Sequence, residues 1–293
     1  MFSFLPAFIS SPITFILFCA NLALCGVVIC TGGVLKLLLP FKTAHKLLHI
    51  VMHATFRLWA LINYLIMIGF NKIEWEISGD ENLNKSSWYL IIANHQSWMD
   101  IFVLANFART RIPETKFFLK DSLKKVPFIG MGCWALDMPF MKRYSRAYIE
   151  KHPHLKGKDI ETTRKSCLKY KETPTTIINF VEGTRKSPEK LKNSPYDYLL
   201  PPKAGGIAFT LAAMGEQFDK ILNITLCYPE NHGHIMKDLL AGRLTKIIVK
   251  VEQISVSEEI IGDYFNDKKF KNSFQEWINN LWTRKEKLLK SLY

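Results

Sequence analysis

A chain of 293 residues with 48% hydrophobic and 22% charged residues is long enough for one sizeable domain plus an appendage, and this composition excludes global disorder. The formal net charge of +13 favours anionic partners such as lipid headgroups, phosphorylated substrates, acidic carrier proteins or nucleic acid. The 6 cysteines include no Cys-x-x-Cys pair, and this spacing gives no support to a zinc site or a disulfide framework.

The N-terminal segment is apolar. Residues 1–35 contain no charged side chain, and residues 12–35 are almost continuously hydrophobic. About 20 such residues are enough to cross the hydrocarbon core of a bilayer. A cleavable signal peptide needs a basic start and a shorter apolar core, and residues 1–11 provide neither. The sequence therefore predicts a retained membrane anchor that includes a transmembrane helix.

A second apolar segment, residues 47–70, follows a cluster of basic residues that begins at Lys36. The basic residues predict that the C-terminal side of the first helix faces the cytoplasm. Arg57 would cost about 2.5–3.5 kcal/mol at the centre of a bilayer, so an embedded or interfacial helix with Arg57 reaching the headgroups is favoured. A second full crossing would reverse the side of the remaining chain and stays open. The expected anchor covers residues 1–70.

Residues 71–293 are expected to form one α/β domain, because strand patterns alternate with helical ones. The predicted strands cover residues 72–77, 88–93, 176–181, 221–228 and 246–251, and the predicted helices cover residues 97–107, 203–214 and 270–292. The polar, proline-punctuated residues 188–202 are expected to form a surface loop. The expected fold is a central mixed sheet flanked by helices, with an N-terminal membrane-embedded helical segment.

A histidine and an aspartate follow the predicted strand 88–93 closely in sequence. We expect His95 at the mouth of the strand and Asp100 in the first turn of the next helix. The carboxylate could then hold one imidazole nitrogen while the other faces a substrate, as in a histidine general base. The structural alternative is a capping box formed by Ser97 and Asp100. Both roles are compatible, because a carboxylate has two oxygens.

A second polar segment, Glu182-Gly183-Thr184-Arg185, follows the predicted strand 176–181. Gly183 permits a positive φ and a close approach of the backbone to a ligand. Arg185 can bind a phosphate by donating two parallel hydrogen bonds to it. A surface ion pair between Glu182 and Arg185 is the structural alternative, but it does not explain why an apolar strand leads into these residues.

These segments resemble the glycerolipid acyltransferase family, whose best-known members are 1-acylglycerol-3-phosphate acyltransferases (lysophosphatidate acyltransferases). The resemblance rests on an ungapped Asn-His-x-x-x-x-Asp motif that starts at Asn94 and a Phe-x-Glu-Gly-Thr-Arg motif that ends at Arg185. The block between them contains Lys120 and ends at Arg143, as in the family's second motif. The resemblance covers residues 73–229 and implies an α/β acyltransferase domain.

The resemblance implies transfer of a fatty acyl group from an acyl thioester, either acyl-CoA or acyl-ACP (acyl carrier protein), to the sn-2 hydroxyl of 1-acylglycerol-3-phosphate, giving phosphatidate. It implies catalytic roles for His95 as the general base and for Asp100 as its orienting carboxylate. The implied substrate-binding residues are Asn94, Lys120, Arg143, Glu182, Gly183, Thr184 and Arg185. No metal and no cofactor beyond the acyl-thioester co-substrate are implied.

The acceptor stays open, because the chain looks closer to a bacterial branch related to lysocardiolipin acyltransferases. Thr225 or a neighbour stands where the family's fourth motif usually has proline. Lysocardiolipin and lysophosphatidylglycerol are therefore alternative acceptors. A remote alternative is a non-enzymatic, membrane-tethered module that binds polyanions, although nucleic acid is not expected because the basic residues are not interleaved with aromatic ones. The expected location is the bacterial inner (cytoplasmic) membrane, with the catalytic domain on the cytoplasmic side.

Overall fold

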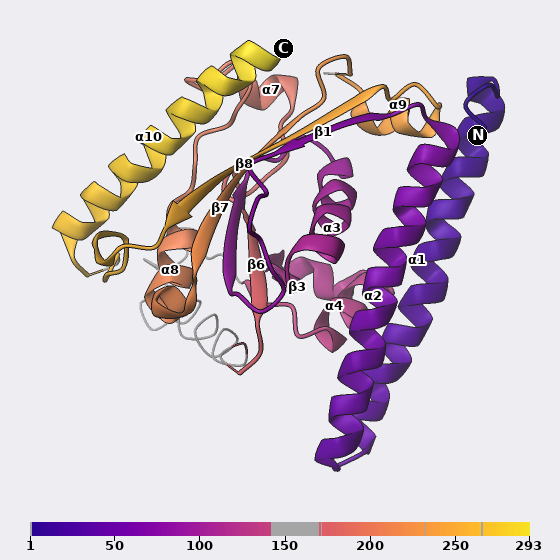
Figure 1. Ribbon diagram of the computed structural model, residues 1–293, viewed down its shortest axis with the longest axis horizontal. Helices are drawn as coiled ribbons and strands as arrows, with labels where there is room; N and C mark the ends of the chain where they lie inside the picture. Colours follow the sequence, from indigo (N-terminus) through magenta and orange to yellow (C-terminus); the bar gives the residue numbers. More distant parts are fainter. Residues whose placement is uncertain (1, 142–169, 171, 232, 265) are drawn as a thin grey trace.

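The computed structural model describes residues 2–141, 170, 172–231, 233–264 and 266–293. A six-stranded sheet in the order β1-β8-β7-β2-β6-β3 forms its centre. β7 and β8 run antiparallel, whereas the other neighbouring strands run parallel. The predicted mixed sheet with flanking helices is thus confirmed (Figure 1).

The five predicted strands and three predicted helices are all present, with ends shifted by a few residues. The strands are β1 (Glu74–Ser78), β2 (Tyr89–Ala93), β3 (Glu114–Phe117), β4 (Leu119–Lys120), β5 (Phe140–Met141), β6 (Thr175–Phe180), β7 (Lys220–Cys227) and β8 (Lys246–Ser255). The α-helices are α1 (Ala7–Leu38), α2 (Lys42–Phe70), α3 (Met99–Arg111), α4 (Ile129–Ala135), α7 (Pro188–Leu191), α8 (Gly205–Met214), α9 (Ile235–Leu240) and α10 (Lys268–Leu292). The sequence patterns miss β3, β4, β5, α4, α7 and α9, because such short runs carry little periodicity.

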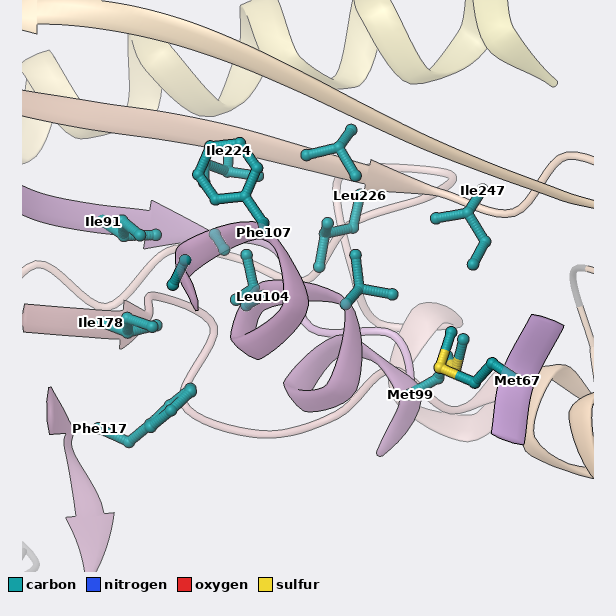
Figure 2. Packing of buried hydrophobic residues seen from close by; sticks show 14 of the residues in the cluster. Met67, Ile91, Met99, Leu104, Phe107, Phe117, Ile178, Ile224, Leu226 and Ile247 are labelled. Carbon is teal, nitrogen blue, oxygen red and sulfur yellow. The ribbon is translucent and has the colours of Figure 1, made fainter. Parts of the chain in front are cut away.

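The central strand β2 is buried over its whole length because helices cover both faces of the sheet. Ile91 belongs to the core on the α3 side, where it packs with Leu104 and Phe107 of that helix (Figure 2). Leu90 belongs to the core on the opposite face, which α8 and α10 cover. The edge strand β1 is only partly buried, as its alternating sequence predicts.

α1 and α2 form a long antiparallel hairpin along one side of the molecule (Figure 1). Both helices are long and apolar enough to cross a membrane. Many of their large apolar side chains are exposed, including Phe8, Phe15, Ile16, Leu24, Val27, Leu37, Leu47, Leu58 and Leu65. The hairpin therefore presents an extensive apolar surface, as expected of a membrane-associated segment.

The α/β domain contacts the hairpin over most of its length. Near the start of α1, the Ser10 hydroxyl donates to the Leu240 carbonyl at 3.1 Å. Near the end of α1, Gly33 lies so close to α4 that an added Cβ would be 2.6 Å from the Cβ of Ala135. These contacts are separated by roughly 35 Å of helix, which exceeds the ~30 Å hydrocarbon thickness of a bilayer.

The predicted boundary at residue 70 coincides with the end of α2, but the two parts share one core that includes Met67. Asn71 joins them, because its amide donates to the Leu239 carbonyl at 3.0 Å and its side-chain oxygen accepts from the Leu244 amide at 2.9 Å. The expected loop 188–202 contains the short helix α7 and also packs inward: Leu199 is fully buried.

Candidate active site

The site lies at the carboxyl ends of three neighbouring parallel strands. His95 follows β2, Glu182 follows β6 and Tyr228 follows β7, and β2 pairs with both of the other strands. The Lys186 amide donates to the His95 carbonyl at 2.9 Å, so the two motif segments are in direct contact. Ligands of open α/β sheets commonly bind at this end of the strands.

The His95 ring is oriented by Asp100. His95 Nδ1 lies 2.8 Å from Asp100 Oδ2, which also accepts from the backbone amides of Gln96 at 2.6 Å and Ser97 at 2.9 Å. Asp100 therefore holds the turn that precedes α3 and orients the histidine at the same time. Because a carboxylate only accepts, the hydrogen lies on Nδ1 of a neutral ring and Nε2 is left as the acceptor.

The ring is also held from the side. It stacks on Phe180, the last residue of β6, with ring centroids 3.9 Å apart and an interplanar angle of 15°. The His95 side chain keeps 13% of its surface exposed, and no hydrogen bond to its Nε2 is found among the described residues. Nε2 is thus free to accept a proton from a bound hydroxyl group.

Tyr228 supplies the remaining hydrogen bond to Asp100, and the sequence reasoning did not identify it. Its hydroxyl donates to Asp100 Oδ1 at 2.7 Å, and both side chains are completely buried. Burial and the Asp100 charge raise the pKa of Tyr228 well above its ordinary value, so the hydroxyl remains a donor. The only sequence signal is that Tyr228 follows an apolar strand, which does not reveal its partner.

Asn94 pairs with the backbone of β7. Its side chain is fully buried, its oxygen accepts from the Leu226 amide at 2.9 Å and its nitrogen donates to the Leu226 carbonyl at 2.9 Å. This pair continues the pairing of β2 with β7 beyond Ala93. Asn94 therefore positions the turn that carries His95, and its predicted contact with substrate stays a prediction.

The Glu182–Arg185 segment forms a tight turn against the start of α3. Gly183 has a φ of 68°, the left-handed conformation that its position predicts. The Arg185 guanidinium lies 4.1 Å above the centroid of the Trp98 ring, which is half exposed. No ion pair between Glu182 and Arg185 occurs within the described part of the chain, so the proposed surface pair is not formed.

Glu182 lies beneath this turn rather than at the surface. Its side chain is buried, and one of its carboxylate oxygens has no hydrogen-bond partner among the described residues. Burial raises the pKa of Glu182 to about 8, although a hydrogen bond from the His95 backbone opposes the change. Glu182 is thus placed to support the turn from below, where it contacts the His95 backbone, and its predicted contact with substrate stays a prediction.

Two further residues join the site from outside the predicted set. Lys186 donates to the Gln96 side-chain oxygen at 3.0 Å, and the Tyr293 hydroxyl donates to the same oxygen at 2.9 Å. Burial lowers the pKa of Lys186. Of the predicted residues, Thr184 accepts a hydrogen bond through its hydroxyl from the Lys190 ammonium at 2.8 Å. A basic residue directly after the motif was the available signal for Lys186, whereas the role of Tyr293 depends on the distant helix α10.

Comparison with known proteins identifies the family. Residues 74–227 match the family model described as Acyltransferase, which is more than half of the chain. The chain belongs to this acyltransferase family. The resemblance predicted from the two motifs is thereby confirmed.

Curated relatives act in lipid acylation according to their names. The acyltransferase is 27% identical over 273 residues to lysophosphatidylinositol acyltransferase 10 of Caenorhabditis elegans, covering 87% of this chain and 65% of that protein. It is 28% identical over 223 residues to lysocardiolipin acyltransferase 1 of Mus musculus, covering 70% of this chain and 54% of that protein. These matches thus span between about half and two thirds of the relatives' length.

A solved structure shares the fold. The acyltransferase matches the 1-acyl-sn-glycerophosphate (LPA) acyltransferase PlsC from Thermotoga maritima with a TM-score of 0.52 and 17% sequence identity. The match covers 94% of this chain and 98% of that chain, so it includes the N-terminal hairpin as well as the α/β domain.

The two remaining predicted anion contacts belong to the block between the motifs. Lys120 ends β4, and its backbone pairs with Met141 of β5. Arg143 lies two residues further on and outside the described residues. The backbone pairing brings both ends of the block together, while the contacts of Lys120 and Arg143 with a substrate stay predictions.

A group of possible metal ligands lies elsewhere in the acyltransferase. His49 and His53 of α2 and Glu114 of β3 each offer a ligand atom, and these atoms all lie within 4.8 Å of one another. The buried Lys116 ammonium, however, lies 3.0 Å from His53 Nε2 and 3.9 Å from the Glu114 carboxylate. This ammonium would repel a metal ion and already balances the glutamate charge. The absence of a metal requirement in the reaction stays a prediction.

Proposed function

We propose that this acyltransferase transfers a fatty acyl group from an acyl thioester, acyl-CoA or acyl-ACP, to the sn-2 hydroxyl of 1-acylglycerol-3-phosphate, giving phosphatidate. The observation that carries the proposal is the 2.8 Å contact between His95 Nδ1 and Asp100, which leaves Nε2 free to accept a proton. The family and the two motif segments that meet at this histidine support it.

In the proposed mechanism, His95 Nε2 takes the proton of the sn-2 hydroxyl, and Asp100 stabilises the resulting imidazolium. The hydroxyl oxygen attacks the thioester carbonyl carbon, the tetrahedral intermediate expels the thiolate, and the thiolate takes the proton from the imidazolium. A general base of this kind contributes ~10²–10⁴-fold, so positioning of the two substrates must supply much of the remaining acceleration.

Arg185 is the proposed contact of the acceptor's phosphate. Its guanidinium is held on the Trp98 ring and has no carboxylate partner among the described residues, so its N–H groups remain available. Stacking on an aromatic face orients the planar group without using its donors. Gly183 and Thr184 would shape the glycerol site beside it, and Lys120 and Arg143 are proposed as additional phosphate contacts.

A second candidate is the same reaction on a lysophospholipid with a larger headgroup, such as lysocardiolipin or lysophosphatidylglycerol. The curated relatives that match 87% and 70% of the chain are named for lysophosphatidylinositol and lysocardiolipin, which favours this candidate. Each acceptor carries a phosphate group near a free hydroxyl, so the same arrangement of His95 and Arg185 suits either class of acceptor.

We further propose that the hairpin lies in one leaflet, at the cytoplasmic face of a bacterial inner membrane. The α/β domain flanks α1 from Ser10 to Gly33, and a perpendicular crossing would draw that domain into the hydrocarbon. These contacts count against the predicted crossing by residues 12–35. A hairpin in the plane of the leaflet would bury its exposed apolar side chains and place the site beside its lipid acceptor.

The test is an acyl-transfer assay with the purified full-length protein, a panel of lysolipid acceptors and both thioester donors, with mass spectrometry of the products. We expect His95→Ala to abolish transfer on every acceptor while membrane association is retained. His234→Ala, which changes an exposed histidine on the N-terminal side of α9, is the matched control and should keep the wild-type rate. Near-normal transfer by His95→Ala, or no transfer by the wild type to any acceptor, would refute the proposal and favour a non-enzymatic module.

A further inference from the structure

A cavity lies at the other end of α3 from His95. Its volume is about 220 Å³, and it is lined by the last turns of α3, the middle of α2 and the start of β3. Asp100 and Arg109, which mark the two sites, are nine residues apart on α3, or roughly 13 Å along the helix. The cavity is therefore separate from the active site, which lies at the carboxyl ends of the strands.

Three basic side chains line this cavity: Arg57 of α2, Lys85 of the loop before β2, and Arg109 of α3. None of the three forms an ion pair with a carboxylate in the described part of the chain. By contrast, Arg111, which does not line the cavity, pairs with Asp80 at 2.6 Å. Unpaired cations around a concavity concentrate a positive potential within it.

Arg109 is held ready for a ligand by neutral neighbours. Its Nε donates to the Asn106 side-chain oxygen at 3.1 Å, and its guanidinium lies 5.7 Å from the centroid of the Tyr64 ring. These contacts orient the group and leave its terminal N–H groups without a partner among the described residues. A guanidinium in this state suits bidentate recognition of a phosphate.

The one carboxylate in the lining is already compensated. Glu114 faces His53, with Nε2 at 3.2 Å, and the buried Lys116 ammonium at 3.9 Å. Its negative charge is offset by the Lys116 ammonium and by Arg57, and the basic side chains of the lining outnumber it. The net charge of the cavity wall remains positive.

The cavity also adjoins the apolar surface of the hairpin. Arg57 follows Ile50 by seven residues, so both lie on the same face of α2, and Ile50 and the neighbouring Leu58 are exposed. The floor is made by small side chains, Ala60, Ala105 and Ala108, which leave room for a ligand. A ligand with a phosphate in the cavity could therefore keep its acyl chains on the apolar face of α2.

We propose that this cavity binds the phosphate group of an anionic phospholipid that is not a substrate. Such a lipid would be held by Arg57, Lys85 and Arg109 and would bridge the hairpin to α3. The chemistry recognised is a phosphate, which a lipid headgroup or free phosphate could provide. The continuity with the apolar face of α2 favours the lipid.

Native mass spectrometry of the full-length protein in a neutral detergent, titrated with phosphatidylglycerol or phosphatidylcholine, tests the proposal. We expect tighter binding of phosphatidylglycerol, and an affinity about tenfold lower for the double variant Arg57→Gln/Arg109→Gln. The control Arg111→Gln removes the same charge from the same helix outside the cavity and should keep the wild-type affinity. Equal binding by the double variant and the wild type would overturn the proposal.

Two single variants and a competition measurement determine where the lipid binds and which part of it is recognised. Lys85 is an exposed loop residue, so Lys85→Gln should not disturb folding. This variant should also weaken phosphatidylglycerol binding, and unchanged binding would contradict the proposed lipid site in the cavity. Arg185→Ala, at the active site, should leave the affinity unchanged, and a loss there would move the lipid to the substrate site. Displacement of phosphatidylglycerol by inorganic phosphate at equal concentration would overturn the assignment to a lipid.

Discussion

Tyr228→Phe tests whether the carboxylate that orients His95 must itself be held. The change removes one hydroxyl group and keeps the ring. That hydroxyl donates to Asp100 Oδ1 at 2.7 Å, whereas the other carboxylate oxygen accepts from His95 Nδ1 and two backbone amides. Both Tyr228 and Asp100 are 0% exposed, so solvent does not replace the lost donor.

The magnitude follows from the loss of one buried hydrogen bond to a charged group. Such a bond contributes ~1.5–3 kcal/mol, and we expect the free energy of unfolding to fall by that amount. The carboxylate also loses the contact that fixes its rotation, so the His95 ring is held less firmly. We expect kcat to fall about tenfold, equivalent to ~1.4 kcal/mol, with both KM values nearly unchanged. Asp100→Asn should cost far more, roughly 10⁴-fold.

Initial rates measured with each substrate varied in turn, together with denaturant unfolding, check this prediction. Tyr89→Phe is the matched control, because Tyr89 is 2% exposed and its hydroxyl accepts from the Asn84 amide at 3.1 Å, at the opposite end of β2. The control should lose stability and keep its kcat. The reasoning is refuted if Tyr228→Phe keeps the wild-type kcat, or loses no more of it than Tyr89→Phe does.

Three further predictions concern substrate binding, pH and metal ions. Arg185→Ala should raise the KM of the phosphate-bearing acceptor about tenfold and the KM of the thioester less. Lys192→Ala removes an exposed cation and should change neither KM. A rise confined to the KM of the thioester would contradict the assignment of Arg185 to the acceptor's phosphate. Because the pKa of Glu182 is raised to about 8, its protonated form favours the folded state and this contribution is lost as the pH rises from about 4.5 to 8. Glu182→Gln should remove that slope, at most ~1.4 kcal/mol per pH unit, and parallel unfolding free energies of variant and wild type across this range would contradict it. Treatment with a strong chelator should leave kcat unchanged, and a loss restored by a divalent metal would show that the reaction needs one.

The central pair of the site was predictable because it is local. His95 and Asp100 are separated by one turn between a strand and a helix, so the sequence spacing alone constrains their distance. Gly183 was predictable for the same reason, since its positive φ is a property of one tight turn.

The supporting contacts were not predictable, because they depend on the register between strands far apart in the chain. Tyr228 reaches Asp100, and Asn94 reaches Leu226, only because β7 lies beside β2 in one particular register. A shift of that register by one residue would turn every side chain of β7 to the other face of the sheet. The family resemblance implied a substrate contact for Asn94, but it could not indicate the pairing of this side chain with the Leu226 backbone.

The hairpin shows a different limit. Hydrophobic content predicts that residues 1–70 associate with a membrane, but it does not distinguish the buried stripe of α1 from the exposed one. The buried stripe of α1 contains small and polar residues at helical spacing, including Ser10, Thr14 and Asn21. The Asn21 side-chain amide donates to the Asn63 side-chain oxygen of α2 at 2.7 Å. This periodic placement of polar residues was the available signal that α1 packs against protein along its length.

The charges around His95 explain how the site could stabilise an imidazolium and still attract an anionic substrate. Asp100 is buried and accepts four hydrogen bonds, so its charge is directed inward at the His95 ring. Glu182 lies nearby, and its pKa of about 8 keeps it mostly protonated at neutral pH, which spares the site a second negative charge. The positive charge of Arg185 is therefore not cancelled where the phosphate would bind. Glu182 therefore does not add a negative charge that would oppose the approach of an anionic substrate.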